Sequence, residues 1–214
     1  MDSLALYLNA TLRQIEQAHG EAPLMQRAGQ AAADWACELA SDRNQPVLIL
    51  AGPGNNGGDA FEVARLLRER FFDLRVVFAG DPLALPPDAA AAFERFITSG
   101  GATLPAIPDE SRWGMIVDGL FGIGLRRPPE GIHAELITAA NRLADRDDCP
   151  LLALDCPSGL NADTGMPQGP SIRASHTITF IAAKPGLLTA DGPDHCGEVR
   201  VAGLDIPFSP ELPP

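Results

Sequence analysis

Basic side chains are scarce in this sequence, which has 16 lysines and arginines against 28 aspartates and glutamates and a net charge of −12. Proteins that bind nucleic acids need a concentrated basic face, so we expect no nucleic-acid partner. A small anionic ligand remains compatible with this charge, because local backbone amides can hold an anion.

Long apolar runs are missing as well. No run approaches the roughly 20 residues that a membrane-spanning helix requires, so we expect no membrane partner. The N-terminal stretch MDSLALYLNATLRQ lacks the basic region, apolar stretch and cleavage site of a secretory signal. We therefore predict a soluble, cytoplasmic protein.

Cysteine is sparse and scattered, with no CxxC pair. This pattern favours reduced thiols in a cytoplasm and disfavours a disulfide framework or a zinc site. The histidines are not spaced like a set of metal ligands either. The residues concerned are Cys37, Cys149, Cys156, Cys196, His19, His133, His176 and His195.

What the sequence does contain is an alternation of apolar strands and amphipathic helices. A chain of 214 residues fits one domain, 1–214, in which residues 208–214 form a frayed end or the start of a linker. The apolar pattern predicts strands at 47–51, 74–80, 113–120, 151–155, 176–183 and 198–204. It predicts helices at 11–20, 23–39, 61–71, 88–100 and 132–144. This order predicts an α/β fold, with a mostly parallel sheet between two layers of helices.

The first glycine loop, GPGNNGGD at residues 52–59, follows a predicted strand. It fits the G-x-G-x-x-G dinucleotide fingerprint, but Gly58-Asp59 replaces the Lys-Ser/Thr of a phosphate-binding P-loop, which excludes an ATPase. Asp59 near a helix start would repel a pyrophosphate. An NAD-dependent dehydrogenase with Asp81 as the ribose-binding acid remains an alternative. So does a purely structural turn in which Asp59 caps the helix.

Two more motifs follow predicted strands, DGLFGIGLRRP at 118–128 and DCPSG at 155–159. Because the carboxyl ends of parallel strands meet at one edge of a sheet, we expect all three motifs to converge there. Arg126 and Arg127 are candidate phosphate contacts, or solvated surface arginines. Asp155 is a candidate general acid or base, or a residue that binds its own turn. Lys184 reaches the same crevice or lies on the surface.

Five motifs then occur in the order found in one family: LMQRAG, GPGNNGGDA, VDGLFGIGLRRP, LDCPSGLNADTG and TFIAAKPGL. Over about residues 21–207 the chain resembles the NAD(P)H-hydrate epimerases, the YjeF N-terminal domain family. The resemblance implies a Rossmann-like three-layer α/β/α sandwich. It also implies an isomerase that interconverts the R and S forms of hydrated NADH and NADPH, NAD(P)HX, in nicotinamide nucleotide repair. A dehydratase, fused to the epimerase in many bacteria, then acts on the S form, and a homodimer is a family-level expectation.

The resemblance also implies the roles of individual residues. It makes Asp155 the catalytic carboxylate and implies a potassium ion, whose oxygen ligands suit a hard cation. Ala60 and Cys156 depart from the family pattern, and both are small residues that we expect to be tolerated. Potassium is assigned to Asn56, Asp118 and Ser158. The substrate is assigned to Asn55, Asn56, Gly57, Gly58, Asp59, Gly122, Ile123, Gly124, Leu125, Arg126, Arg127, Pro128 and Asp155.

A second class of function stays open beside the enzyme. A chain that keeps the pocket can bind a nucleotide or a protein without turnover. Asp155 and the three implied potassium ligands favour the enzyme, because a pure binding module does not need them.

Overall fold

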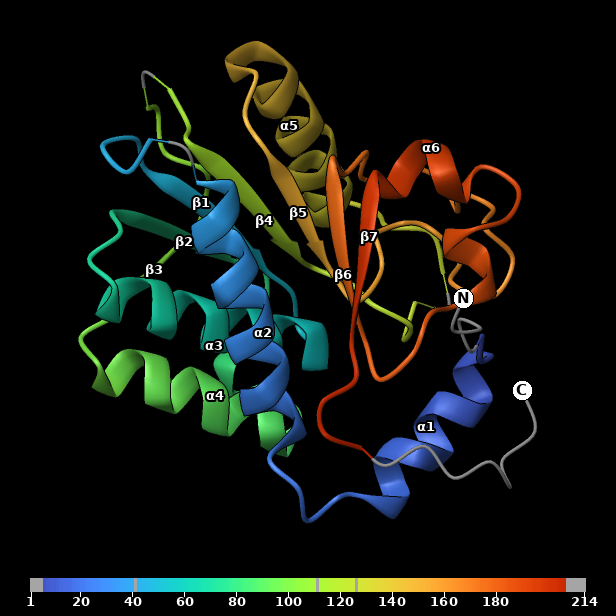
Figure 1. Cartoon of the computed structure of the whole chain (residues 1–214). Helices are drawn as coiled ribbons and strands as arrows, with labels where there is room; N and C mark the ends of the chain where they lie inside the picture. Colours follow the sequence, from blue (N-terminus) through green and yellow to red (C-terminus); the bar gives the residue numbers. More distant parts are fainter. Residues whose placement is uncertain (1–5, 41, 111, 126, 207–214) are drawn as a thin grey trace.

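The structure is a computed structural model that describes residues 6–40, 42–110, 112–125 and 127–206. Within these residues seven strands form one sheet in the order β3-β2-β1-β4-β5-β6-β7, and every pairing is parallel (Figure 1). The predicted α/β class is confirmed. The tail at 208–214 lies outside the described residues.

The three central strands are buried along their whole length, as their apolar sequences on both faces predict. Strand β6 ends earlier than the pattern predicts, because Ile181 has φ 67° and leaves the sheet. The short edge strand β3 was not predicted. The strands are β1 (Val47–Ala51), β2 (Leu74–Phe78), β3 (Thr103–Leu104), β4 (Met115–Gly119), β5 (Leu151–Leu154), β6 (His176–Phe180) and β7 (Glu198–Ala202).

Helices cover both faces of the sheet (Figure 1). Helices α2 (Leu24–Leu39), α3 (Asn55–Glu69) and α4 (Pro87–Thr98) pack on one face, and α5 (Ile132–Asp147) packs on the other. The short α6 (Gly192–Cys196) precedes β7, and α1 (Asn9–Ala18) lies beyond the carboxyl ends of the strands. Among the described helices, none is both long and apolar enough to cross a membrane.

Helix α3 begins at Asn55, six residues before the helix predicted from the apolar pattern. The NNGGD half of the glycine loop therefore forms the first turns of α3. The N-cap is Gly54, without a side-chain hydrogen bond, so the alternative in which Asp59 caps the helix is wrong.

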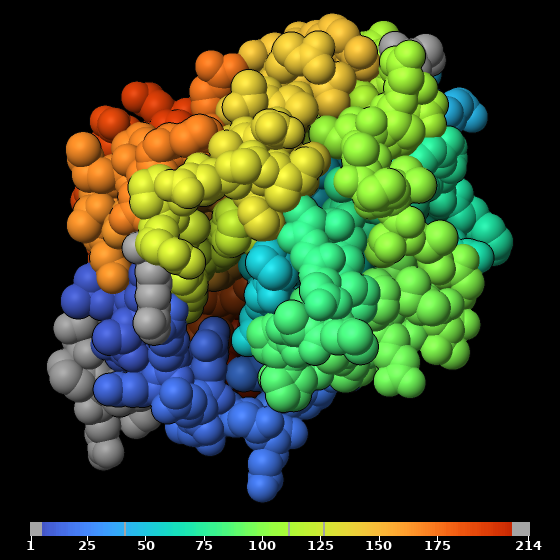
Figure 2. Space-filling view, turned by 180° about the vertical axis from the view of Figure 1, so that it is seen from behind, coloured from blue at the N-terminus to red at the C-terminus, as the bar shows by residue number. Residues whose placement is uncertain are grey.

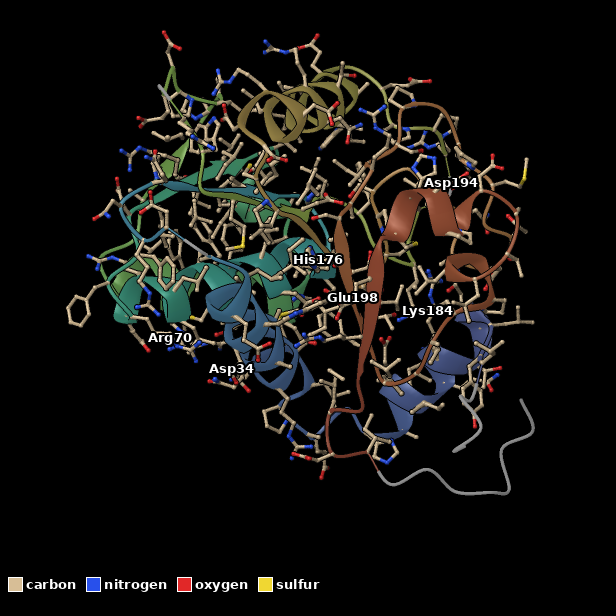
Figure 3. All side chains as sticks on the ribbon, turned by 45° about the horizontal axis from the view of Figure 1, so that its top comes forward. Asp34, Arg70, His176, Lys184, Asp194 and Glu198 are labelled. Atoms are coloured by element: carbon tan, nitrogen blue, oxygen red, sulfur yellow. The ribbon has the colours of Figure 1, made fainter. Side chains whose placement is uncertain are left out.

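Ionic contacts hold the helices of this face together. Glu62 on α3 is fully buried and accepts hydrogen bonds from Arg65 on its own helix and from Arg95 on α4. Arg70, directly after α3, pairs with Asp34 on α2 at 2.5 Å (Figure 3). A buried carboxylate needs such partners, because burying an unpaired charge is costly. These contacts hold α3, whose first turns are formed by the second half of the glycine loop.

Close backbone contacts at the strand ends require glycine. A Cβ atom on Gly52 would overlap the carbonyl oxygen of Leu120, in the loop after β4. A Cβ atom on Gly57 would overlap the carbonyl oxygen of Gly52. The first glycine loop thus packs on itself and on the second loop, with backbone against backbone.

We predict that Gly57→Ala lowers the free energy of unfolding by about 3 kcal/mol, because the new methyl group has no space in a packed backbone contact. Gly54→Ala is the matched control. Gly54 has φ −116°, and no atom lies within 4 Å of the position that a Cβ atom would take there. This change should cost less than about 1 kcal/mol, the scale of a changed helix cap. Urea unfolding measures both, and equal midpoints for the two variants would contradict the packing argument.

Candidate functional site

The three sequence motifs meet at the carboxyl edge of the sheet, as predicted. They line a cavity of about 510 Å³. Figure 2 shows the corresponding hollow, bordered by α1 in blue and by the loop after β4 in yellow-green. The lining residues are Arg13, Glu16, Pro53, Gly54, Asn55, Asn56, Asp59, Pro86, Leu120, Phe121, Gly122, Ile123, Gly124, Leu125, Asp155 and Phe180.

Not every residue assigned to the substrate lies in this lining. Gly57 and Gly58 are buried in α3 behind it, where Gly58 leaves room for Met25. Arg127 and Pro128 are exposed and are not among the lining residues. Arg126 lies outside the described residues. The assigned residues that do line the cavity are Asn55, Asn56, Asp59, Gly122, Ile123, Gly124, Leu125 and Asp155.

Asp155 is held in place by a buried lysine. The Nζ atom of Lys184 donates hydrogen bonds to Asp155 Oδ1, to Thr179 Oγ1 at 2.7 Å and to the carbonyl oxygen of Phe180 at 3.1 Å. Lys184 is only 1% exposed, so the alternative of a surface lysine is wrong (Figure 3). Its position shortly after β6 places the ammonium group beside the end of β5.

The other carboxylate oxygen of Asp155 faces the second loop, and Oδ2 accepts a hydrogen bond from the amide of Ile123 at 3.3 Å. The backbone of Asp155 is left-handed, with φ 66°, and its amide donates to the carbonyl of Ile178 at 2.7 Å. Its carboxylate is therefore engaged by Lys184 and Ile123 rather than by the amides of its own turn. Such strained positions are kept where the surroundings over-determine them, often at functional sites.

Asp118 and Ser158 form a second, fully buried polar pair. Asp118 Oδ1 accepts from the hydroxyl of Ser158 at 2.7 Å, and Oδ2 accepts from the amide of Ser158 at 2.8 Å. Burial raises the pKa of Asp118 to about 6, although the hydrogen bonds from Ser158 and Leu120 act in the opposite direction. Burial thus opposes the negative charge of Asp118 at the end of β4.

Asn56 has a buried side chain with unused hydrogen-bonding capacity. It is 7% exposed, and neither its Oδ1 nor its Nδ2 atom has a partner among the described residues. A Cβ atom on Gly122 would lie 3.4 Å from Asn56 Oδ1 and 2.9 Å from Asp155 Oδ2. The side chains of Asn56 and Asp155 therefore both border the same glycine. A buried amide without partners is unusual and indicates an interaction that the protein alone does not supply.

Asp59, in the first turns of α3, is a carboxyl group whose pKa is raised by its surroundings. Burial raises its pKa well above the ordinary value, the nearby Asp155, Glu16 and Glu62 add to this rise, and Lys184 opposes it. Burial and Asp155 raise the pKa of Glu16 as well. The surroundings of Asp59 therefore oppose its negative charge.

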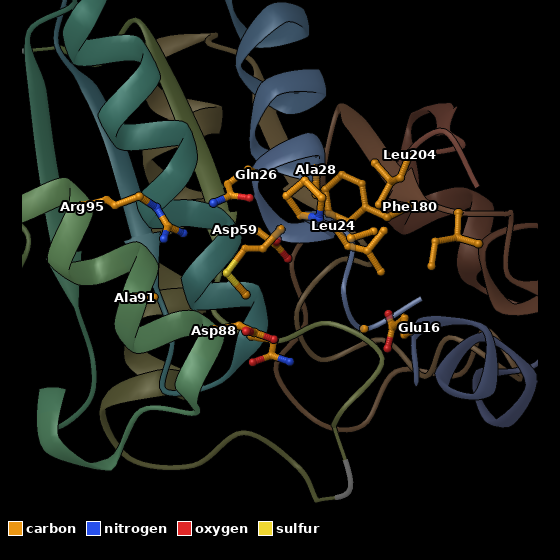
Figure 4. A pocket seen from close by; sticks show the side chains of 16 residues that line it. Glu16, Leu24, Gln26, Ala28, Asp59, Asp88, Ala91, Arg95, Phe180 and Leu204 are labelled. Atoms are coloured by element: carbon orange, nitrogen blue, oxygen red, sulfur yellow. The ribbon is translucent and has the colours of Figure 1, made fainter. Parts of the chain in front are cut away.

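A smaller cavity of about 230 Å³ adjoins the first and shares Glu16, Asn55, Asp59 and Phe180 with it. Figure 4 shows Asp59 between Arg95 of α4 on one side and Glu16 of α1 on the other. Neither Glu16 nor Arg13 was among the predicted site residues. Their helix is far from the motifs in the chain, and only its amphipathic pattern indicated that it packs on the domain.

Two further residues singled out in the sequence, Cys156 and Asp81, are not among the residues that line the cavity. Cys156, one of the two departures from the family pattern, is fully buried, and burial raises the pKa of its thiol well above the ordinary range, which disfavours a nucleophile. Asp81, the candidate ribose-binding acid, instead accepts a hydrogen bond from the amide of Leu83 at 2.9 Å and caps a short helical turn. Within the described residues, no three His, Cys, Asp or Glu side chains are grouped so as to hold a metal.

The sequence is similar to known proteins along most of its length. The sequence is 41% identical to the NAD(P)H-hydrate epimerase of Bordetella pertussis (strain Tohama I) over 187 residues, 86% of this chain and 79% of that protein. It is 39% identical over 193 residues to the bifunctional NAD(P)H-hydrate repair enzyme of Leishmania major, 86% of this chain and 33% of that longer protein.

A solved structure shows the same fold. The crystal structure of the yeast protein ynu0 (YNL200c) matches with a TM-score of 0.76 at 21% sequence identity, covering 95% of this chain and 90% of that one. The profile of the family described as YjeF-related protein N-terminus matches residues 21–186, which include the first four sequence motifs and all but the last residue of the fifth. With this match and the similarity to the bacterial epimerases, the chain belongs to the family of YjeF-related protein N-termini.

Proposed function

We propose that this chain is an isomerase that interconverts the R and S forms of NAD(P)HX, the hydrated forms of NADH and NADPH. The relatives from Bordetella carry the name of this activity. The observation that carries the proposal is the carboxylate of Asp155, fixed by the buried Lys184 at the wall of a cavity of about 510 Å³. A fixed carboxylate with one side toward a cavity is a suitable acid–base group.

The two epimers differ at the ring carbon that carries the hydroxyl group, so the reaction must break and re-form one bond at that carbon. In one route Asp155 protonates the ring hydroxyl, which leaves as water to give an iminium ion, and the carboxylate then takes a proton from the water that adds to the opposite face. In the other route the hydroxyl proton is passed to the ring nitrogen, the bond between that nitrogen and the carbon breaks to give an aldehyde, and the ring closes on the opposite face. Lys184 keeps one oxygen of Asp155 occupied and so fixes the direction of the other. Asp59, in the first turns of α3, lines the same cavity and is the second carboxyl group that contacts the substrate. Two carboxyl groups in contrasting environments are a common acid–base arrangement.

A potassium ion fits the residues at the carboxyl ends of β1, β4 and β5. Asn56 has a side-chain oxygen without a partner among the described residues, and Asp118 and Ser158 offer a carboxylate and a hydroxyl. These are the oxygen ligands that hard cations prefer. When bound, the ion supplies positive charge that neutralises the buried Asp118 and orders the first glycine loop.

The proposed reaction also implies a partner activity. An epimerase repairs a cofactor only if a dehydratase consumes one of the two epimers. The relative from Leishmania major is named as a bifunctional repair enzyme and is about three times as long as the matched region. We therefore propose functional coupling to an NAD(P)H-hydrate dehydratase, in the cytoplasm.

The function is tested with a mixture of R- and S-NADHX from which an S-specific dehydratase has removed the S form. Addition of this protein should then restore NADH absorbance rapidly, because the R form is converted to the S form. Asp155→Asn keeps the size of the side chain and removes its acid–base function, so we expect a loss of about 100- to 10,000-fold in turnover.

The binding of substrate by Asp155→Asn should stay within a few-fold of the original protein. An Asn variant with full turnover would remove Asp155 from the mechanism. Recovery no faster than the spontaneous rate with the original protein would contradict the enzyme and favour a binding module.

Potassium should stabilise the protein more at pH 8 than at pH 5. The pKa of Asp118 is about 6 in the folded protein, above its ordinary value of 3.8, so without a cation its ionisation costs stability as the pH rises between these values. A bound cation offsets this cost only when the carboxylate is ionised. We expect potassium chloride, compared with choline chloride at equal concentration, to raise Tm by about 3 °C or more at pH 8.

Asp118→Asn is the control for this effect and should remove its dependence on pH. Both proteins are compared by thermal unfolding at the two pH values. An equal rise in Tm at pH 5 and pH 8 in the original protein would argue against an ion on Asp118.

A further inference from the structure

The substrate of the proposed function carries a diphosphate, but its cavity is rich in carboxylates. Glu16, Asp59 and Asp155 all line the cavity. The ammonium group of Lys184 is paired with Asp155, and Lys184 is not among the lining residues. Within the described part of the chain, Arg13 is the one lysine or arginine that lines this cavity. A diphosphate therefore has a single described cation to meet there.

Most N–H donors of the Arg13 side chain have no hydrogen-bond acceptor among the described residues. Its Nη2 atom donates one hydrogen bond, to the carbonyl oxygen of Ile123 at 3.3 Å. Over the described residues, no carboxylate lies within 4 Å of its guanidinium group. A guanidinium group has five N–H donors, so most of them remain available for a ligand. Two parallel N–H bonds to phosphate oxygens are the arrangement that arginine favours.

The position of Arg13 suits an extended dinucleotide. Its Nη2 atom lies about 4.0 Å from the site where Gly124 would carry a Cβ atom, so the guanidinium group stands next to an open stretch of backbone. The neighbouring Ile123 gives its carbonyl to Arg13 and its amide to Asp155 Oδ2. Ile123 of the second loop thus lies between the guanidinium group of Arg13 and the carboxylate of Asp155.

Helix α1 is anchored firmly enough to hold this cation. Leu12 and Ile15 are buried against the domain, and the amide of Asn9 donates to Asp163 Oδ1 at 2.8 Å. The amide of Tyr7 donates a hydrogen bond to the carbonyl oxygen of Ala183 at 3.0 Å. Ala183 directly precedes Lys184 in the chain. The helix that carries Arg13 is therefore attached to the segment that fixes Asp155.

We propose that Arg13 binds the diphosphate group of the dinucleotide substrate and so places the nicotinamide ring against Asp155. This inference rests on the proposed function and deepens it. Arg127 is exposed and does not line the cavity, so among the described arginines the one placed for a phosphate contact is on α1.

Binding is measured first, because it does not depend on turnover. Isothermal titration with NAD⁺ and with nicotinamide riboside compares a ligand that has a diphosphate with one that has none. Arg13→Gln should weaken the binding of NAD⁺ by about 10- to 100-fold, the scale of a lost charge-assisted contact. The affinity for nicotinamide riboside should not change. Arg13→Lys keeps the charge but not the two-pronged geometry, so its loss should be smaller.

Two arginine variants serve as controls. Arg173 is exposed and paired with Asp145 on the α5 side of the molecule, so Arg173→Gln should leave both affinities unchanged. Arg127→Gln tests the alternative phosphate contact. A loss of NAD⁺ affinity in Arg127→Gln and none in Arg13→Gln or Arg13→Lys would overturn the proposal. An equal loss of both ligands in the Arg13 variants would also overturn it, because it would indicate damage to α1.

Turnover then separates this inference from the proposed function. With NADHX, Arg13→Gln should raise KM by about the same factor and leave kcat within a few-fold, the pattern of lost binding energy. If the original protein does not epimerise NADHX, the proposed function fails, while the comparison of the two ligands still decides the role of Arg13. If it does epimerise NADHX and Arg13→Gln has an unchanged KM, the inference alone fails.

Discussion

The site depends on one buried ion pair, between Lys184 and Asp155. A lysine that is 1% exposed is stable only with a partner for its charge, and Asp155, Thr179 and the carbonyl of Phe180 supply all three acceptors. The pair joins the end of β5 to the segment after β6, and the backbone of Asp155 is left-handed at this point. In the mechanism that we propose, the carboxylate of Asp155 is thereby positioned before the substrate binds, as efficient proton transfer requires.

The remaining groups of the cavity are arranged around this pair under a shortage of positive charge. The protein has a net charge of −12, and its cavity brings several carboxyl groups close together. Burial opposes part of this negative charge, because it raises the pKa of Asp59 and raises the pKa of Asp118 to about 6. Lys184 neutralises Asp155, and a cation on Asp118 together with Arg13 beside the second loop completes the balance that we propose. An acidic cavity that lacks the lysine of a phosphate-binding P-loop can thus accept a dinucleotide.

Much of this arrangement is readable from the sequence, and the failures have physical reasons. The alternation of strands and helices, and the meeting of three motifs at one edge, follow from periodicity and from parallel topology. The pattern placed the start of α3 too late, because polar and glycine residues give no apolar period even where the backbone is helical. It left Lys184 undecided, since a lysine next to proline has no local sign of burial. It missed Arg13 and Glu16, because contacts between α1 and the second loop, 110 residues apart, leave no local signal.

The central claim, that Asp155 and Lys184 act as one unit, is tested most directly by a double-mutant cycle on turnover. Asp155→Asn, Lys184→Met and the double variant are compared by kcat for NADHX. If the lysine acts through the carboxylate, each single change lowers kcat strongly, and the double variant is no slower than the slower single variant. Losses that multiply, so that the double variant falls by the product of the two single effects, would show that the two residues act independently and would contradict the account.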